Sequence, residues 1–282
     1  MIVLLIVAVV LLIASILEYP KWTLVILSAS LIYGTLSPLI SARRLYFLSA
    51  ASAHIALLAV VLSIPLAKIA LNEYLWAIAI GLALLYTVGY SIHRGMDEDI
   101  ATAIFVSLTA SLSVIAMYLV LTRYSIGYNL WVIILGDPLL VSWREAYYAF
   151  GVAIITLLAT LLSYREQVSI GIERDCAVLT GINVRIYDWL LYTLLGIATI
   201  AMIKIVGFVL QHVLILLPAA VSMLVAKDSK GMLLMSILVS VISGLSGLQL
   251  SVMINQAPSG VIGLLMFGIY VTAFLIKRCC HE

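Results

Sequence analysis

The stretch YREQVSIGIERDCAVLTGINVRIYD, Tyr164–Asp188, is the longest part of this 282-residue sequence that must lie in water. Two apolar runs follow it almost without a loop, and the second of them contains the letters LLPAA. The polar stretch is too short to form a catalytic domain. We interpret it as a docking element, a turn or two of helix with linkers, through which a separate protein moves membrane helices.

The composition around this stretch is that of a membrane protein. Hydrophobic residues make up 65% of the chain and charged residues only 10%, whereas soluble chains have about 45–50% and about 25%. The net charge of +2 is too small to indicate a nucleic-acid partner. Cys176, Cys279 and Cys280 lack the spacing of a zinc or disulfide site. The sequence therefore predicts an all-α, polytopic helical bundle that crosses the cell membrane several times, with residues 1–282 forming a single transmembrane domain.

Ten segments are candidates for membrane crossing, because a spanning helix needs about 20 mostly apolar residues. We expect about ten transmembrane helices, within a range of eight to ten. The first is interpreted as a retained helix and not a signal peptide, and the eighth contains Pro218, where a break is the alternative. The segments are 2–17, 21–41, 46–67, 73–92, 100–121, 146–163, 186–206, 207–226, 231–253 and 259–276.

The basic residues between these segments predict the orientation. With the N-terminus inside, ten lysines and arginines lie on the cytoplasmic side and five on the outer side, so both termini are expected to be cytoplasmic. The longest outer connection, 122–145, is apolar in its middle and is a candidate re-entrant or interfacial helix. The cytoplasmic set is Arg43, Arg44, Arg94, Arg165, Arg174, Arg185, Lys227, Lys230, Lys277 and Arg278, and the outer set is Lys21, Lys68, Arg123, Arg144 and Lys204.

Ionisable residues inside the spans are functional candidates by default, because placing them in lipid is costly. Asp188 and Lys204 lie near helix ends, where snorkelling or pairing is the expected role. His54 lies among small residues in LSAASAHIALLAV, which suit close helix packing. It is either a packing histidine, hydrogen-bonded across helices, or a transient cation ligand.

Two further polar groups interrupt the apolar runs. His212 follows Gln211 and precedes Pro218 by six residues, so the pair either satisfies backbone groups freed by the proline or lines a pathway. Asn255 and Gln256 lie in INQAPSG, where their amide oxygens suit harder cations or a pathway mouth, although the same letters are typical of a turn.

The sequence contains no enzyme signature. It has no phosphate-binding glycine loop with its lysine, no paired carboxylates within a span and no nucleophile with a base at a recognisable spacing. The acidic run 97–99 is expected to cap a helix N-terminus. We therefore expect a transport subunit that is not an enzyme and holds no cofactor stably.

Five segments in order resemble the permease subunit of ABC importers for zinc, manganese and iron, over roughly residues 36–270. Each match is modest, and their common order makes the resemblance fairly specific. The segments are ARRLYFLSAASAHIALLAV (42–60), GDPLLVS (136–142), ERDCAVLTGI (173–182), IVGFVLQHVLILLPAAVSMLVAK (205–227) and LSVMINQAPSGVIG (250–263).

The resemblance implies a permease domain that forms a homodimer in membrane lipid and binds no nucleic acid. Two copies of a cytoplasmic ABC ATPase would hydrolyse ATP beneath it, and an extracytoplasmic metal-binding protein would deliver the cargo. A coupling helix within about 166–184 would sit in a groove of the ATPase. The residues assigned to this coupling are Glu173, Arg174, Asp175, Ala177 and Gly181.

The cargo implied is a divalent transition metal, zinc or manganese, moved by alternating access. Its pathway would contain His54, His212, Asn255 and Gln256. Two carboxylates usual in the family are missing: Ala50 stands four residues before His54, and Gln256 stands two residues before Pro258. The alternatives are an ABC permease for a metal chelate or other small solute, and a stand-alone channel or secondary carrier.

Overall fold

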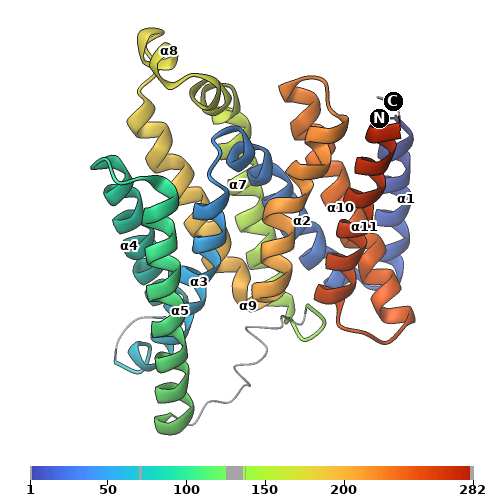
Figure 1. Ribbon diagram of the computed structural model, residues 1–282. Coiled ribbons are helices and arrows are strands. Elements are labelled where there is room, and N and C mark those ends of the chain that lie inside the picture. The colour runs from blue at the N-terminus through green and yellow to red at the C-terminus, as the bar shows by residue number, and fades with distance from the viewer. Residues whose placement is uncertain (1, 70–71, 125–135, 137, 280–282) are drawn as a thin grey trace.

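The computed structural model describes residues 2–69, 72–124, 136 and 138–279, and the regular structure in these ranges is helical (Figure 1). The expected all-α fold is therefore confirmed. The described helices are α1 (Ile2–Glu18), α2 (Pro20–Ala42), α3 (Tyr46–Leu66), α4 (Glu73–His93), α5 (Glu98–Arg123), α7 (Trp143–Ile172), α8 (Arg174–Leu179), α9 (Val184–Val225), α10 (Ser229–Met253) and α11 (Pro258–Cys279).

Eight of the described helices are long and apolar enough to cross a membrane. The exceptions are α1, which has 17 residues, and α8, which has six. The expected acidic cap is present at α5, where the Asp97 side chain accepts hydrogen bonds from the backbone N–H groups of Asp99 and Ile100. The multi-pass bundle expected from the sequence is confirmed.

Helix α9 folds back on itself at one residue. Its 42 residues would extend about 63 Å at 1.5 Å per residue, about twice the 30 Å hydrocarbon core. Gly207 has φ 78° and ψ 166°, and Figure 1 shows the helix descending from α8 and returning toward α10. We call residues 184–206 the first arm and 208–225 the second arm.

The expected division between 206 and 207 coincides with this turn, but the alternative break near Pro218 is wrong. Pro218 lies inside the second arm. The conformation of Gly207 is one that only glycine adopts readily, so the turn depends on this residue. A Cβ added to Gly136 would meet the carbonyl oxygen of Val206, so Gly136 packs directly on the turn. Residues 125–135 and 137 of the predicted re-entrant connection lie outside the described residues.

The bundle has two end faces. The beginning of α1, the end of α11 and α8 lie on one side, which we call the α8 face (Figure 1). The turn at Gly207 and the connection between α10 and α11 lie on the other, which we call the Gly207 face. This arrangement agrees with termini on the same side as the polar stretch, and their cytoplasmic placement stays a prediction.

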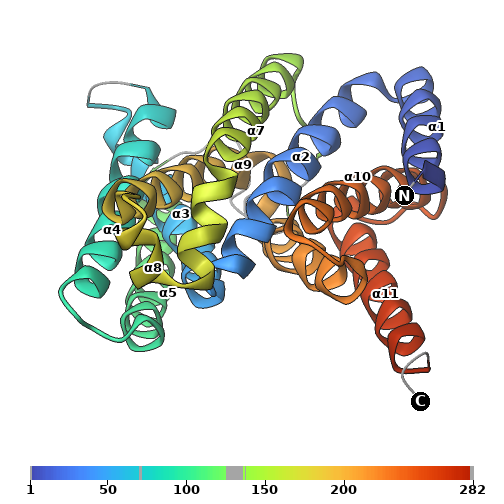
Figure 2. The same ribbon diagram turned by 90° about the horizontal axis from the view of Figure 1, so that it is seen from above.

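The centre of the bundle is formed by α2, α3 and α9, with α1, α5 and α11 toward its edges (Figure 2). The outer helices expose large apolar side chains, such as Leu119 and Leu264, as a lipid-facing surface does. Many buried hydroxyl groups donate to carbonyl oxygens of their own helix; Ser28 bonds Leu24 and Thr199 bonds Leu195. Such local bonding satisfies polar groups where water is absent.

Candidate functional site

The polar stretch that begins at Tyr164 is not mainly a linker. We expected the preceding span to end at 163, but α7 continues to Ile172, so only α8 remains as a separate short helix. The reason is a buried face on α7, where Tyr164, Gln167 and Ile170 recur at a spacing of three and pack inward. Polar residues on the other face of α7 interrupt the apolar run, so hydropathy alone did not predict that residues 164–172 continue the helix.

Two of the predicted coupling residues shape α8. Ala177 is buried and packs with Ile170 and Val184, which holds α8 against the bundle. Gly181 ends the helix with φ 86°, and the N–H groups of Gly181 and Ile182 donate to the carbonyl oxygens of Val178 and Ala177. This is a Schellman motif, in which glycine takes the left-handed position without steric cost.

The outward surface of α8 is partly apolar. Glu173, Arg174 and Asp175 are exposed, as the docking interpretation requires. Val178 and Leu179 are also exposed, by 57% and 86%. Val178 and Leu179 were not among the predicted coupling residues, although two adjacent large apolar side chains in a polar stretch are a recognisable signal of a contact surface. Exposed apolar side chains on a helix at the end of the bundle are typical of a protein contact.

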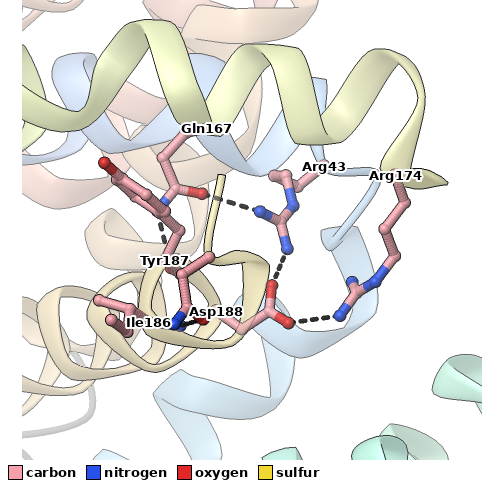
Figure 3. Close-up of polar contacts among 7 residues, drawn as sticks. Arg43, Gln167, Arg174, Ile186, Tyr187 and Asp188 are labelled. Atoms are coloured by element: carbon pink, nitrogen blue, oxygen red, sulfur yellow. Dashed lines mark hydrogen bonds and ion pairs between the residues drawn. The ribbon is translucent and has the colours of Figure 1, made fainter. Parts of the chain in front are cut away.

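A cluster of four polar side chains lies where α8 meets the bundle: Arg43, Gln167, Arg174 and Asp188, the Asp188 cluster (Figure 3). Arg43 forms an ion pair with Asp188 Oδ1, and Arg174 Nη2 contacts Asp188 Oδ2 at 2.6 Å. Arg43 Nη1 donates to Gln167 Oε1 at 3.0 Å, and Gln167 Nε2 donates to the carbonyl oxygen of Tyr187 at 2.8 Å. The pairing expected for Asp188 is confirmed.

The Asp188 cluster joins four elements at the α8 face. Arg43 follows α2, Gln167 belongs to α7, Arg174 begins α8 and Asp188 lies in the first arm of α9. The side chains of Arg43 and Asp188 are only 5% and 9% exposed, whereas that of Arg174 is 54% exposed. Removing one partner of a buried ion pair costs about 3–5 kcal/mol. These helix ends are therefore held together, with Arg174 as the accessible member.

The two span histidines meet between α3 and the second arm of α9, where both are half-buried. The ring centroids of His54, on α3, and His212, on the second arm of α9, are 5.8 Å apart. Phe208 lies against both rings, with centroids 4.9 Å from His54 and 4.3 Å from His212. The sequence nominated each histidine separately, and their contact depends on the packing of α3 against α9.

The polar groups near Pro218 do not satisfy a break there. His212 Nδ1 bonds the carbonyl oxygen of Phe208 at 3.0 Å, toward the Gly207 turn. Gln211 is fully buried, and neither of its amide atoms has a hydrogen-bond partner among the described residues. Close to the proline, the Ala219 N–H instead donates to Ser37 Oγ of α2 at 3.0 Å. His212 therefore packs toward His54 instead of repairing the helix.

Asn255 and Gln256 lie in the turn between α10 and α11, at the Gly207 face, with exposed side chains. Asn255 has φ 58°, and the N–H groups of Asn255 and Gln256 donate to the carbonyl oxygens of Val252 and Ser251. The structure thus pairs the two half-buried histidines within the helices and leaves the two exposed amides in a turn at the end of the bundle.

Carboxylates are scarce around the histidine pair. Within the described ranges, no group of three or more histidine, cysteine, aspartate or glutamate side chains could hold a metal ion. Lys204 forms an ion pair with Glu73, the first residue of α4, which confirms the pairing expected for this lysine. The pair of imidazoles can therefore offer nitrogen ligands to a passing dication, but not a closed metal cage.

Comparisons with known proteins agree with this arrangement. A family model described as the ABC 3 transport family matches residues 18–277. The chain is 27% identical over 248 residues to the manganese transport system membrane protein MntC of Halalkalibacterium halodurans, covering 88% of this chain and 83% of the relative. It is 26% identical over 237 residues to the high-affinity zinc uptake system membrane protein ZnuB of Haemophilus influenzae, covering 83% and 88%.

The fold is also similar to a solved structure, PsaBC from Streptococcus pneumoniae in complex with Fab. The TM-score is 0.80 at 22% sequence identity, and the match covers 93% of this chain and 94% of that chain. The similarity extends over nearly the whole helical bundle.

Proposed function

Because the chain belongs to the ABC 3 transport family, we propose that it is the permease subunit of an ATP-driven importer in the cell membrane. Its cargo is a divalent transition metal, zinc or manganese, as the names of its relatives suggest. The observation that carries the proposal is α8, a short helix locked to the bundle by the Asp188 cluster while Val178 and Leu179 face outward. Such a helix is suited to receive force from a separate ATPase.

The working unit is a homodimer of this permease with two cytoplasmic ABC ATPase subunits. An extracytoplasmic metal-binding protein delivers the ion at the Gly207 face. ATP binding and hydrolysis bias the two conformations of the permease through the different affinity of the ATPase for each. The chain itself is the transport subunit and leaves the hydrolysis to its partner.

Coupling runs from α8 into the bundle through Arg174 and Asp188. Arg174 is half exposed, so it lies between the docking surface and the buried carboxylate of Asp188. Asp188 is held in turn by Arg43, so a displacement of α8 acts on the end of α2 and on the first arm of α9 together. The second arm carries His212, so this proposed pathway residue belongs to the same helix as Asp188.

Substitutions on α8 test the docking surface. Leu179→Glu and Asp175→Arg should each lower copurification of the permease with its ATPase and abolish substrate-stimulated ATP hydrolysis in the reconstituted complex. Met253→Glu is the matched control. Met253, the last residue of α10, is 82% exposed and lies on the Gly207 face, away from α8. The control should leave the association with the ATPase unchanged. Unaltered association and ATP hydrolysis in both α8 variants would refute the assignment of α8.

Pathway residues are tested by uptake. His54 meets His212 between α3 and α9, so His54→Ala should reduce ATP-dependent metal uptake at limiting metal. Asn255 and Gln256 are proposed at the mouth of the pathway, and Gln256→Ala should have a smaller effect because the residue is exposed. Normal uptake by the His54→Ala variant would show that His54 is a packing residue and not a transient cation ligand.

A metal chelate is the second candidate cargo, and the residues at the two usual carboxylate positions favour it. Ala50 and Gln256 offer no negative charge to a bare dication. Uptake measured with free metal and with the same metal in a chelate separates the two cargoes. Transport of the chelate alone would replace the free-ion proposal while leaving the permease assignment intact.

A further inference from the structure

We infer that the imidazole pair of His54 and His212 makes this permease selective for zinc and similar nitrogen-preferring ions over manganese. The inference rests on the proposed function, because it concerns the cargo of the same pathway. Several relatives of this chain are named for manganese. The expected preference for zinc comes instead from the ligand types and geometry of this chain.

The separation of the two rings suits a shared ion. Zinc–nitrogen bonds are about 2.0–2.1 Å, and an imidazole adds about 1 Å between its nitrogen and its centre, so two rings on one ion have centres about 5–6 Å apart. The centroids of His54 and His212 are 5.8 Å apart. The rings come from two different elements, α3 and the second arm of α9, so relative movement of these elements would open the pair and release the ion.

The hydrogen bond of His212 prepares one nitrogen for a metal. A carbonyl oxygen can only accept, so Nδ1 of His212 carries the proton in its 3.0 Å contact with the Phe208 carbonyl. In the neutral ring, Nε2 then holds the free lone pair. A backbone carbonyl that fixes the second nitrogen in this way is the usual partner of a metal-binding histidine.

Among the described residues, the histidine pair lacks the carboxylate neighbours that manganese prefers. Manganese is held mainly by carboxylate, carbonyl and water oxygens and binds most weakly of the first-row dications to a given site, whereas imidazole suits zinc. Position 50, one turn before His54, is alanine. Among the described residues, the buried carboxylate of Asp188 is engaged by two arginines, and Glu73 is paired with Lys204. Among the described residues, the histidine pair therefore has no adjacent carboxylate.

Two protein ligands suit a carrier, because a transported ion must be released in each cycle. A structural zinc site closes all four positions with side chains, and no such group exists in the part of the chain that the structure describes. A pair of imidazoles leaves the remaining positions to water. Binding is then weak enough for release in each transport cycle, yet still discriminates by ligand type.

The experiment measures Zn²⁺ and Mn²⁺ binding to the purified permease without its delivery protein, whose own selectivity would otherwise contribute. Cys279, Cys280 and His281 are replaced by serine to remove a second potential metal-binding group. ATP-dependent uptake of each metal by the complete reconstituted complex is measured in parallel. The variants are His212→Ala, His212→Asp and the control His93→Ala, which changes a histidine at the end of α4.

We expect Zn²⁺ to bind at least about tenfold more tightly than Mn²⁺, as the affinity order for such sites requires. His212→Ala removes a direct ligand, so it should weaken Zn²⁺ binding by at least the roughly 10–100-fold that loss of an outer-shell partner costs. His212→Asp should narrow the difference between the Zn²⁺ and Mn²⁺ affinities. His93→Ala should change neither the Zn²⁺ affinity nor the Mn²⁺ affinity. Equal or tighter Mn²⁺ binding, or Zn²⁺ binding that survives His212→Ala, would overturn the inference. Uptake of neither metal by the complete complex would instead overturn the proposed function.

Discussion

At the scale of single residues, Gly207 sets the direction of the two arms of α9 relative to each other. Its φ of 78° and ψ of 166° are adopted easily only by glycine, and Gly136 packs directly on the preceding carbonyl. The sequence marked this position, because two apolar runs meet there without a loop. The contact of His54 with His212 could not be predicted in the same way, since it depends on how α3 packs on α9.

Gly207→Ala should destabilise the protein, because alanine must adopt a backbone conformation that costs about 1–3 kcal/mol. Thermal unfolding of the purified protein in detergent measures the effect as a lower midpoint. Gly151→Ala is the control: Gly151 lies inside α7, and a Cβ added there meets nothing within 4 Å. The control should hold or raise the midpoint, since alanine favours helix. Equal midpoints for both variants would mean that the turn tolerates a side chain.

At the scale of elements, hydropathy located the helices well and their ends less well. The predicted span 146–163 stops where the apolar run stops, whereas α7 continues to Ile172 because Gln167 and Ile170 face the bundle. Gln167 is polar yet fully buried, and it accepts a hydrogen bond from Arg43. A sequence pattern cannot distinguish such a residue from a solvent-exposed one, since the partner is 124 residues away.

Asp188→Asn should lower the free energy of unfolding by about 3–5 kcal/mol, because it leaves the buried guanidinium of Arg43 without its counter-charge. Arg174→Gln should cost much less stability, since the Arg174 side chain is 54% exposed. Chemical denaturation of both purified variants gives the comparison. The ranking is contradicted if the Arg174 variant is the less stable of the two.

Two variants of Arg174 separate stability from coupling. Arg174→Gln keeps the buried pair, so the permease should still assemble with its ATPase while transporting less metal per ATP hydrolysed. Arg174→Lys, which restores the charge, should recover part of the transport. If Arg174→Gln transports as efficiently as the unaltered protein, the link from α8 through Asp188 plays no part in transport.

At the scale of the whole molecule, composition alone predicted the class of protein and the resemblance predicted its family, which spans 18–277. The helical path places the beginning of α1, the end of α11 and α8 on one face (Figure 1). The excess of basic residues on that side predicts that it faces the cytoplasm. The number of crossings was harder to predict, because α1 is short and α9 contains two arms in one apolar stretch.

Thiol labelling tests this orientation. Cys176 is exposed on α8, so a membrane-impermeant maleimide should label it in inverted vesicles and not in right-side-out vesicles. Cys279 and Cys280 are replaced by serine for this measurement. Asn255→Cys, in a background without Cys176, should show the reverse pattern because it lies on the Gly207 face. Labelling of both positions from the same side would contradict the arrangement.

The sharp turn in α9 also affects how the chain enters its membrane during biosynthesis. The two arms meet at Gly207 without a hydrophilic loop between them. Arg185 and Lys227 lie near the ends of the arms that are far from Gly207. The insertion machinery therefore has no polar segment to translocate at this point. Basic residues resist translocation, so both ends are expected to be retained on the side of synthesis. Residues 184–225 should accordingly enter the bilayer as one helical hairpin, in a single concerted event.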